Sequence, residues 1–171
     1  MIKFINDSKN IPYIKFKEEY EKAVSNNQHA IEAISISSFN KDLNEVDSRF
    51  VNLKYILNDE WVFFSNYDSP KAQSFISHDQ ISALFYWSSI NIQVRIKAKI
   101  KKTSQKFSDE HFISRSVEKN ALAISSKQSK IIESYEKVVN DYNVILENKE
   151  SLTERPANWG GFSFTPYYFE F

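Results

Sequence analysis

Two cations and several hydroxyl groups of this sequence could together bind a phosphate group. Arg49 and Lys71 can neutralise a phosphate dianion, and hydroxyl groups can donate hydrogen bonds to its oxygens. The hydroxyl groups that we consider belong to Ser65, Ser69 and Ser129. The amide of Gln93 offers a donor and an acceptor, as the edge of a heterocyclic ring requires. Taken alone, Arg49 and Lys71 could equally be solvated charges of a strand and a helix.

The glycine content limits how a phosphate could be held. The chain has only 2 Gly, Gly160 and Gly161, and they are adjacent. Loops of the P-loop or dinucleotide-binding kind need several Gly at fixed spacing, so the sequence excludes them. A phosphate site in this chain must therefore use side chains and the N-terminus of a helix.

The remaining titratable residues indicate neither a metal site nor a nucleic-acid surface. The chain has 0 Cys, which excludes disulfides and thiolate chemistry and favours a reducing, cytoplasmic location. His29, His78 and His111 lack the spacing of a metal site. Lys plus Arg and Asp plus Glu both number 22, so no net charge attracts nucleic acid or an anionic membrane. Neither a signal peptide nor a run of about 20 apolar residues is found, so we expect no membrane association.

The strand signals indicate an antiparallel barrel. Short segments of Ile, Val and aromatic residues are bounded by Asn, Asp and Ser, which is typical of strands separated by turns. They lie at 30–39, 49–56, 61–64, 81–87, 92–100 and 162–171, the last interrupted by Pro166. Helices are inserted among these strands without alternating strictly with them. We therefore predict a mainly β fold, an antiparallel barrel with added helices.

Helix signals occur at four places. Apolar residues at helical spacing predict amphipathic helices at 16–24 and 131–142. Serine side chains that can cap a helix predict two more, from Ser69 to Ser77 and from Ser108 to Phe112. With 171 residues, of which 42% are hydrophobic, the chain can bury one core, and we predict a single domain spanning 1–171.

Five segments, by their order and spacing, resemble the pyridoxamine 5′-phosphate oxidase family. They are SRFVNLK (48–54), WVFFSNYDSPKAQ (61–73), ALFYWSSINIQVRIKA (83–98), HFISRSVEKNALAISSKQS (111–129) and RPANWGGFSFTPYYFEF (155–171). The sequence WGGF before an aromatic strand is the most specific part. The resemblance implies a split β-barrel that binds flavin mononucleotide (FMN) and forms a homodimer, with FMN in clefts between the subunits.

The resemblance also implies which residues bind the cofactor and the substrate. The residues that correspond to FMN contacts are Arg49, Phe50, Val51, Asn52, Lys54, Phe64, Ser65, Ser69, Lys71, Gln93, Gln128, Ser129 and Trp159. Those that correspond to substrate contacts are Lys54, His111, Arg115 and Lys119. Two alternatives remain open at this point. Trp159 could be a packing residue of the core, and Arg115 could form a surface ion pair with Glu118.

The sequence departs from the family pattern mainly on the substrate side. Pro70 replaces a basic residue of the phosphate-binding turn, His111 stands where a Tyr is usual, and Lys119 stands where a Ser is usual. The family continues beyond the position of Phe171 into a segment with an Arg-x-His substrate motif and a further flavin-contacting Arg, which this sequence lacks. The residues expected to bind flavin are largely retained.

The resemblance thus implies an FMN-dependent oxidase. Such an enzyme would oxidise a phosphorylated amine or alcohol by hydride transfer to the flavin, with oxygen as the acceptor. An alternative is an FMN-binding protein without pyridoxamine phosphate oxidase turnover. A third hypothesis is a barrel that binds oligonucleotides, which the 15% aromatic content suggests. The chain lacks the basic surface that such binding needs. We expect a small-molecule substrate and no metal or nucleic acid.

Overall fold

The structure, a computed structural model, describes residues 1–148 and 152–171. Seven strands and five helices alternate irregularly along these residues. In chain order they are β1 (Lys3–Ile5), α1 (Ile11–Ser25), β2 (Ala33–Asn40), β3 (Glu45–Leu57), β4 (Glu60–Asn66), α2 (Pro70–Ser77), β5 (Gln80–Trp87), β6 (Ile92–Lys102), α3 (Gln105–Ile113), α4 (Val117–Ser125), α5 (Tyr135–Glu147) and β7 (Trp159–Glu170).

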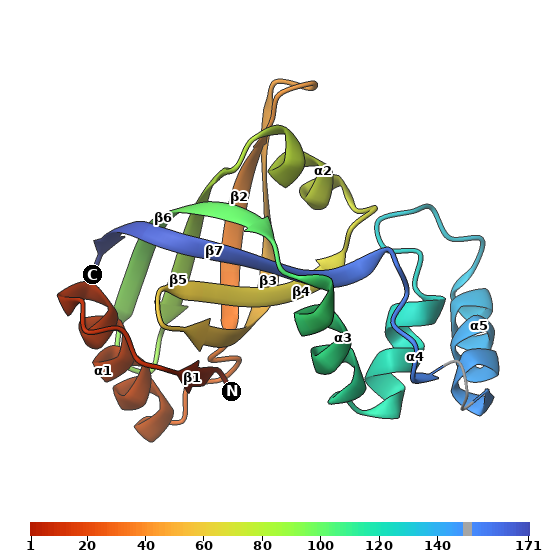
Figure 1. The fold of residues 1–171 in the computed structure, drawn as a ribbon, viewed down its shortest axis with the longest axis horizontal. Helices are drawn as coiled ribbons and strands as arrows, with labels where there is room; N and C mark the ends of the chain where they lie inside the picture. The colour runs from red at the N-terminus through yellow and green to blue at the C-terminus, as the bar shows by residue number, and fades with distance from the viewer. Residues whose placement is uncertain (149–151) are drawn as a thin grey trace. The chain divides into compact units, whose positions relative to one another are not determined.

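The chain divides into two compact units, which we call the barrel unit and the helical unit. The barrel unit contains Met1–Phe64, Ser74–Lys101 and Phe162–Phe171. The helical unit contains Ser65–Gln73 and the described residues of Lys102–Gly161. Helices α3, α4 and α5 belong to the helical unit (Figure 1).

The barrel unit is built on a closed sheet. The strand order is β3-β2-β5-β6-β7-β4, and a further pairing of β4 with β3 closes it, while β1 adds to β3 as a parallel edge strand. Strand β3 pairs antiparallel with β2 and β4, and β5 pairs antiparallel with β2 and β6. Closure leaves few unpaired edges, which is how antiparallel folds avoid edge-to-edge association. The predicted antiparallel barrel with added helices is confirmed.

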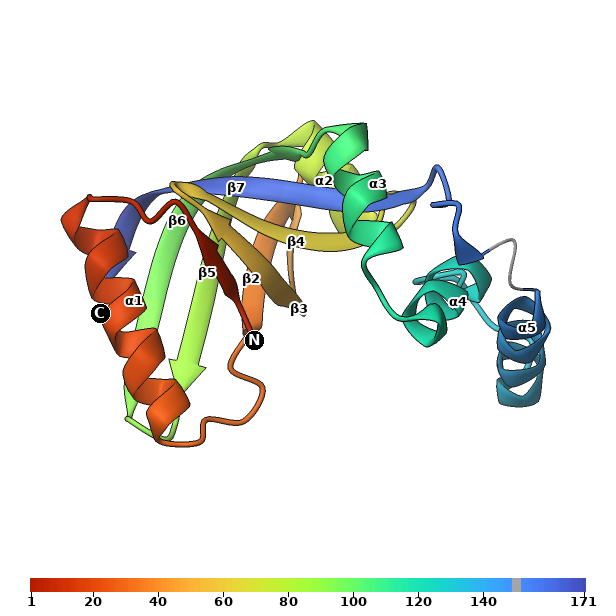
Figure 2. The ribbon, with the colours of Figure 1, turned by 60° about the horizontal axis from the view of Figure 1, so that its bottom comes forward.

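An aromatic core joins helix α1 to this sheet. Phe16 of α1 lies 4.4 Å from Trp61 of β4 and 5.4 Å from both Phe85 and Trp87 of β5, measured between ring centroids. All four side chains are fully buried. Burying rings of this size stabilises the fold by roughly 2–3 kcal/mol each, so the apolar face of α1 fixes the helix on the barrel (Figure 2).

Asparagine residues make the tight hairpin turns possible. Asn44, Asn58 and Asn91 follow β2, β3 and β5, with φ angles of 53°, 55° and 50°. These angles lie in the left-handed region, where Asn is tolerated better than most residues because its short side chain bonds locally. The chain has only 2 Gly, so Asn takes the position that Gly usually occupies in such turns.

Three sequence predictions of element detail need correction. Ser104, and not Ser108, caps helix α3, because its hydroxyl accepts from the Phe107 N–H at 3.2 Å, whereas Ser108 is buried inside the helix. Strand β7 continues through Pro166, since a proline removes only one N–H donor from a strand. Ile131 lies outside α5, which begins at Tyr135 and has no buried residue. The sequence reading also missed α4 and β1.

Asparagine also stabilises the helical unit from within. The buried amide of Asn120 in α4 donates to the carbonyl groups of Phe112 and Leu152, both at 3.0 Å. Because an unsatisfied buried carbonyl is costly, this side chain fixes α4 to the end of α3 and to the segment before β7. Among residues 1–148 and 152–171, no helix is long and apolar enough to cross a membrane.

Candidate functional site

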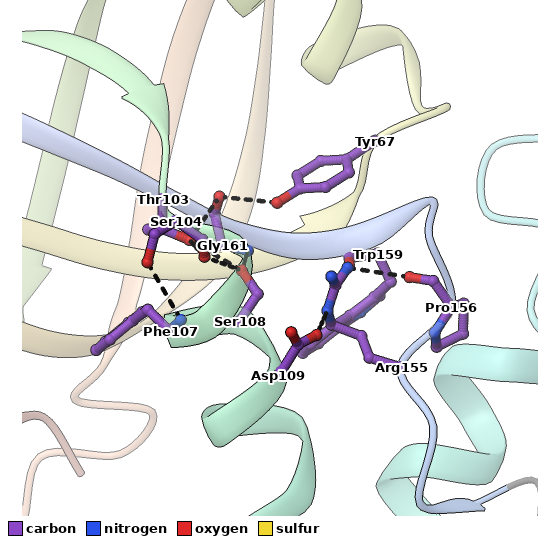
Figure 3. A network of polar contacts seen from close by, with 10 residues as sticks. All are labelled: Tyr67, Thr103, Ser104, Phe107, Ser108, Asp109, Arg155, Pro156, Trp159 and Gly161. Carbon is purple, nitrogen blue, oxygen red and sulfur yellow. Dashed lines mark hydrogen bonds and ion pairs between the residues drawn. The ribbon is translucent and has the colours of Figure 1, made fainter.

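A polar network in the helical unit holds the main chain at the start of β7 (Figure 3). The carbonyl oxygen of Gly161 accepts hydrogen bonds from the Thr103 N–H at 3.0 Å and from the Tyr67 hydroxyl at 3.2 Å. The Gly161 N–H donates to the Ser108 hydroxyl at 3.1 Å. The Thr103 and Ser108 hydroxyls lie 2.9 Å apart. Both main-chain groups of Gly161 are therefore fixed by three elements of the same unit.

Gly160 is required by the close approach of Tyr67. A Cβ atom at Gly160 would lie 2.2 Å from the Tyr67 hydroxyl oxygen and 3.0 Å from the Ser108 hydroxyl oxygen. Distances below about 3 Å between such atoms are forbidden by their van der Waals radii. Gly160 of the sequence WGG thus makes room for Tyr67. Burial of Tyr67 raises the pKa of its phenol, so the hydroxyl remains a hydrogen-bond donor at neutral pH.

Arg155 connects helix α3 to the main chain before β7. Its Nε lies 2.6 Å from Oδ1 of Asp109, and its Nη1 donates to the carbonyl oxygens of Pro156, at 3.2 Å, and of Trp159. Only 10% of the Arg155 side chain is exposed. Hydrogen bonds from a charged donor are stronger than neutral ones, so this contact restrains the peptide that carries Trp159 (Figure 3).

Trp159 forms an aromatic platform with a cation and two rings. The guanidinium carbon of Arg115 lies 4.3 Å from the Trp159 ring centroid. The His111 ring is nearly parallel to Trp159, with an interplanar angle of 7° and centroids 6.2 Å apart, and Phe112 meets it edge-on at 5.5 Å. Arg115 Nη2 donates to the carbonyl oxygen of Lys119 at 2.6 Å. The platform consists of His111, Phe112, Arg115 and Trp159.

Arg115 carries a charge that the described residues do not neutralise. Its Nη1 is buried and has no hydrogen-bond partner. Burial lowers its pKa to about 10. Among residues 1–148 and 152–171 no ion pair joins Arg115 to a carboxylate, so the alternative of a surface pair with Glu118 is wrong. A half-buried cation with no carboxylate partner among the described residues favours binding of an anion.

The helical unit also brings together several residues predicted to bind the cofactor. Gln128 Oε1 accepts from the Ser65 hydroxyl at 3.5 Å and from the Asn66 N–H at 3.3 Å. The Ser69 hydroxyl donates to the Asn66 carbonyl oxygen at 2.7 Å, in the turn that leads into α2. Lys71 is buried in the first turn of this helix. Ser129 has a φ of 63° in the turn next to Gln128.

Trp159, also predicted to bind the cofactor, belongs to the helical unit, and the other predicted cofactor residues lie on the barrel unit. Arg49 donates to the Ser38 hydroxyl at 2.7 Å and pairs with Asp47, and 18% of its side chain is exposed. The remaining members of this group are Phe50, Val51, Asn52 and Lys54 on β3, Phe64 on β4, and Gln93 on β6. Gln93 is exposed and lies opposite Tyr86 of β5. The predicted cofactor residues therefore form two groups, one on each unit.

Two residues of this region were not predicted from the sequence. Arg155 lies within the segment that supports the family resemblance, but its partner Asp109 is 46 positions away. No local pattern in the sequence connects them. Tyr67 was likewise missed, because its role follows from its distance to Gly160. Within the described part of the chain, no group of three or more His, Asp or Glu residues is arranged to hold a metal ion.

Comparisons with known proteins place the chain in a family. No protein-family model matches it. A pyridoxine/pyridoxamine 5′-phosphate oxidase of Nostoc sp. is 34% identical over 163 residues, covering 94% of this chain and 75% of that protein. One of Leptospira interrogans is 31% identical over 174 residues, covering 98% and 78%. The chloroplastic pyridoxine/pyridoxamine 5′-phosphate oxidase 1 of Arabidopsis thaliana is 32% identical, and the match spans only 30% of that protein.

Solved structures confirm the fold. PhzG from Burkholderia lata, in complex with tetrahydrophenazine-1-carboxylic acid, superposes with a TM-score of 0.87 at 21% identity, covering 93% of this chain and 78% of that one. A pyridoxamine 5′-phosphate oxidase-related, FMN-binding protein from Nostoc punctiforme gives a TM-score of 0.70 at 11% identity, covering 92% and 82%. The sequence identities and the shared split-barrel fold show that this chain belongs to the pyridoxine/pyridoxamine 5′-phosphate oxidase family.

Proposed function

We propose that this chain binds FMN and oxidises a phosphorylated amine or alcohol. Membership of the oxidase family supports the reaction class. When bound, FMN supplies the hydride acceptor, with oxygen as the terminal acceptor. The observation that supports an anionic substrate is the environment of Arg115. Its buried Nη1 has no hydrogen-bond partner among the described residues, and its guanidinium stacks on Trp159. A cation held in this way favours a ligand with an anionic group.

The residues present fit a phosphorylated flavin. Lys71 places a buried cation in the first turn of α2, where the helix dipole also favours an anion. Gln128, Ser65 and Ser129 add amide and hydroxyl groups within the same unit. On the barrel unit, Arg49 supplies a second cation, and Gln93 supplies an exposed amide suited to a ring edge. We propose that these residues hold FMN and that residues 1–171 serve as one cofactor-binding domain.

Three of the four residues proposed to contact the substrate, Arg115, Lys119 and Lys54, are cations. Arg115 would bind the anionic group directly, and the nearby Lys119 and His111 add donors around it. The carbonyl oxygen of Lys119 holds Arg115 Nη2, so the guanidinium is oriented before a ligand binds. Preorientation of this kind lowers the entropic cost of binding. Lys54 on β3 is the fourth proposed contact.

A second copy of the chain is part of the proposal. Phe50 and Val46 on β3 are 76% and 71% exposed, and Leu43 in the preceding turn is 66% exposed. Neighbouring exposed apolar side chains often mark an interface between proteins. We propose a homodimer with FMN at its interface. Sedimentation of the protein at twice the mass of one chain supports it, whereas a monomer at micromolar concentration, with or without FMN, contradicts it.

FMN binding without turnover is the second candidate. It is favoured by Lys54, because its ammonium group lies 3.6 Å from Glu32 and is thereby partly neutralised. A substrate anion would have to compete with this carboxylate. The two candidates share the flavin site and differ only in whether a substrate is oxidised.

One set of measurements tests these proposals. The absorbance spectrum of the protein as isolated, followed by FMN titration, tests the cofactor. A colourless protein that takes up no FMN refutes both candidates. Release of hydrogen peroxide with pyridoxamine 5′-phosphate or pyridoxine 5′-phosphate supports the oxidase. A yellow protein that releases no peroxide with these substrates supports the second candidate.

A further inference from the structure

The contact between Arg155 and Asp109 restrains the two chain segments that form the platform. Asp109 lies on α3, two residues before His111 and three before Phe112. Arg155 Nη1 donates to the carbonyl oxygen of Trp159 itself. The guanidinium of Arg155 therefore links the helix that carries two platform residues to the peptide that carries the third (Figure 3).

Burial makes this link stronger than an ordinary surface ion pair. The Arg155 side chain is 10% exposed, and its guanidinium donates to one carboxylate and two carbonyl groups. Exposed ion pairs contribute little to the stability of a fold because water and salt screen them. A guanidinium that also satisfies main-chain carbonyl groups fixes a geometry, because its donors are planar and diverge at set angles.

The orientation of the Arg115 guanidinium depends on the position of Trp159 more than the orientation of the other platform residues does. Within the described residues Arg115 contacts the Lys119 carbonyl, the Trp159 ring and the Phe112 ring. A shift or rotation of Trp159 would remove the stacking partner that lies 4.3 Å away. The guanidinium would then lose part of its orientation toward an incoming anion.

We propose that Arg155, together with Asp109, is a positioning residue that holds Trp159 so that Arg115 presents its guanidinium to an anion. Arg155 itself does not touch the anion in this proposal. The proposal rests on the proposed function in one respect, because the anion is taken to be the phosphate of a substrate.

The position of Trp159 can be measured without any ligand. The chain has 3 Trp, and labelling with 5-fluorotryptophan gives one fluorine resonance for each, with Trp159 assigned by Trp159→Phe. In Arg155→Met we expect the Trp159 resonance to move or broaden, while those of Trp61 and Trp87 in the barrel core stay in place. Arg155→Lys should shift it less, because a lysine keeps the charge and one donor. An unchanged Trp159 resonance in folded Arg155→Met overturns the proposal.

A double-mutant cycle tests whether Arg155 acts through Trp159. The ligand is pyridoxamine 5′-phosphate, and binding is measured by calorimetry. We expect Arg155→Met to weaken binding about tenfold in the wild-type background and less than about twofold in Trp159→Phe, since residues that act through one another are not additive. Equal losses in both backgrounds contradict a positioning role.

A matched control separates this role from the general loss of an ion pair. Arg95 also pairs with a carboxylate, Glu170, at 2.8 Å, but it lies on β6 and is 53% exposed. Arg95→Met should leave both the Trp159 resonance and ligand binding unchanged, and a matching effect there would overturn the proposal. If wild-type protein binds no pyridoxamine 5′-phosphate, the proposed substrate fails, and the fluorine spectra still decide the role of Arg155.

Discussion

The guanidinium carbon of Arg115 lies 4.3 Å from the centroid of the Trp159 ring, and Nη1 of the same guanidinium is buried without a hydrogen-bond partner in the described part of the chain. The stacking orients the cation, and the Lys119 carbonyl holds its other nitrogen, Nη2. A guanidinium that is oriented but whose charge is not neutralised can bind an anion. Several predictions about anion binding and stability depend on this arrangement and on its surroundings.

Replacing Arg115 by Met should reduce the stabilisation of the protein by phosphate. At a concentration 100 times the dissociation constant of the Arg115 site, phosphate should stabilise wild-type protein by about 2.7 kcal/mol through that site, because it binds the folded chain only. Arg115→Met should show a smaller gain, since the proposed flavin phosphate site at Lys71 remains, and Arg95→Met should behave as wild type. Thermal unfolding with increasing phosphate measures the effect. Equal stabilisation of wild type and Arg115→Met would show that phosphate binds elsewhere.

Anion binding should weaken at high pH. Burial lowers the pKa of Arg115 from its ordinary value to about 10, so the guanidinium loses its proton as the pH rises through this value. The phosphate affinity should be constant between pH 8 and pH 9 and fall above about pH 10. Without ligand, the free energy of unfolding should instead rise with pH over this range, because the unfolded chain binds this proton more tightly than the folded chain does. Calorimetric titrations across this range measure the affinity, and one that stays flat to pH 11 would contradict the assignment.

Gly160→Ala should destabilise the protein by about 2 kcal/mol or more, because the new Cβ would lie 2.2 Å from the Tyr67 hydroxyl oxygen. Urea unfolding measures the change. Combining it with Tyr67→Leu should recover part of the loss, since the phenol is removed. The interpretation fails if Gly160→Ala is as stable as wild type, or if the second substitution adds a further loss of equal size.

Ser104→Ala should cost about 1 kcal/mol in the free energy of unfolding, since its hydroxyl caps the N-terminus of α3. Ser116 offers a matched control. It occupies the N-cap position of α4, but its side chain makes no capping hydrogen bond, so Ser116→Ala should cost less. Chemical denaturation of the two variants compares them directly, and equal costs would argue against the capping role of Ser104.

Glu19 should make stability depend on pH. The hydrogen bond from Lys15, at 2.6 Å, and that from Lys22, at 2.9 Å, lower the pKa of the Glu19 carboxyl. A lowered carboxyl pKa contributes stability above the ordinary value near 4.3 that is lost as the pH falls through the folded-state pKa. Glu19→Gln should therefore cost about 1 kcal/mol at pH 7 and less at pH 3. Urea unfolding at both values checks this, and a cost independent of pH would exclude the ionic contribution.

The barrel was predictable because its signals are local. Each strand reads as a short apolar or alternating segment, and the Asn-containing turns mark where one strand ends and the next begins. Strand β6 shows this best, since Val94, Ile96, Ala98 and Ile100 are buried and their charged neighbours are exposed. A period of two residues follows from strand geometry alone.

Helix boundaries were less predictable because more than one serine could serve as the N-cap of the same helix. Ser104 and Ser108 lie one helical turn apart, and either could cap a helix. Tertiary contacts decided between them. Ser108 is buried and accepts the Gly161 N–H, a partner 53 positions away, which leaves Ser104 as the cap. Strand β7 likewise continues past Pro166, whose carbonyl oxygen accepts from the Tyr13 hydroxyl at 3.0 Å.

The sequence by itself indicated the family to which the chain belongs and every strand except β1, because these depend on residue type and short-range spacing. Only the tertiary structure decided how the platform is built. It left Arg115 without a carboxylate partner among residues 1–148 and 152–171, brought Asp109 to Arg155, and placed Tyr67 against Gly160. These contacts join residues far apart in the chain, and the free energy of a hydrogen bond or a stacked pair depends on distances and burial that no local pattern of residues encodes.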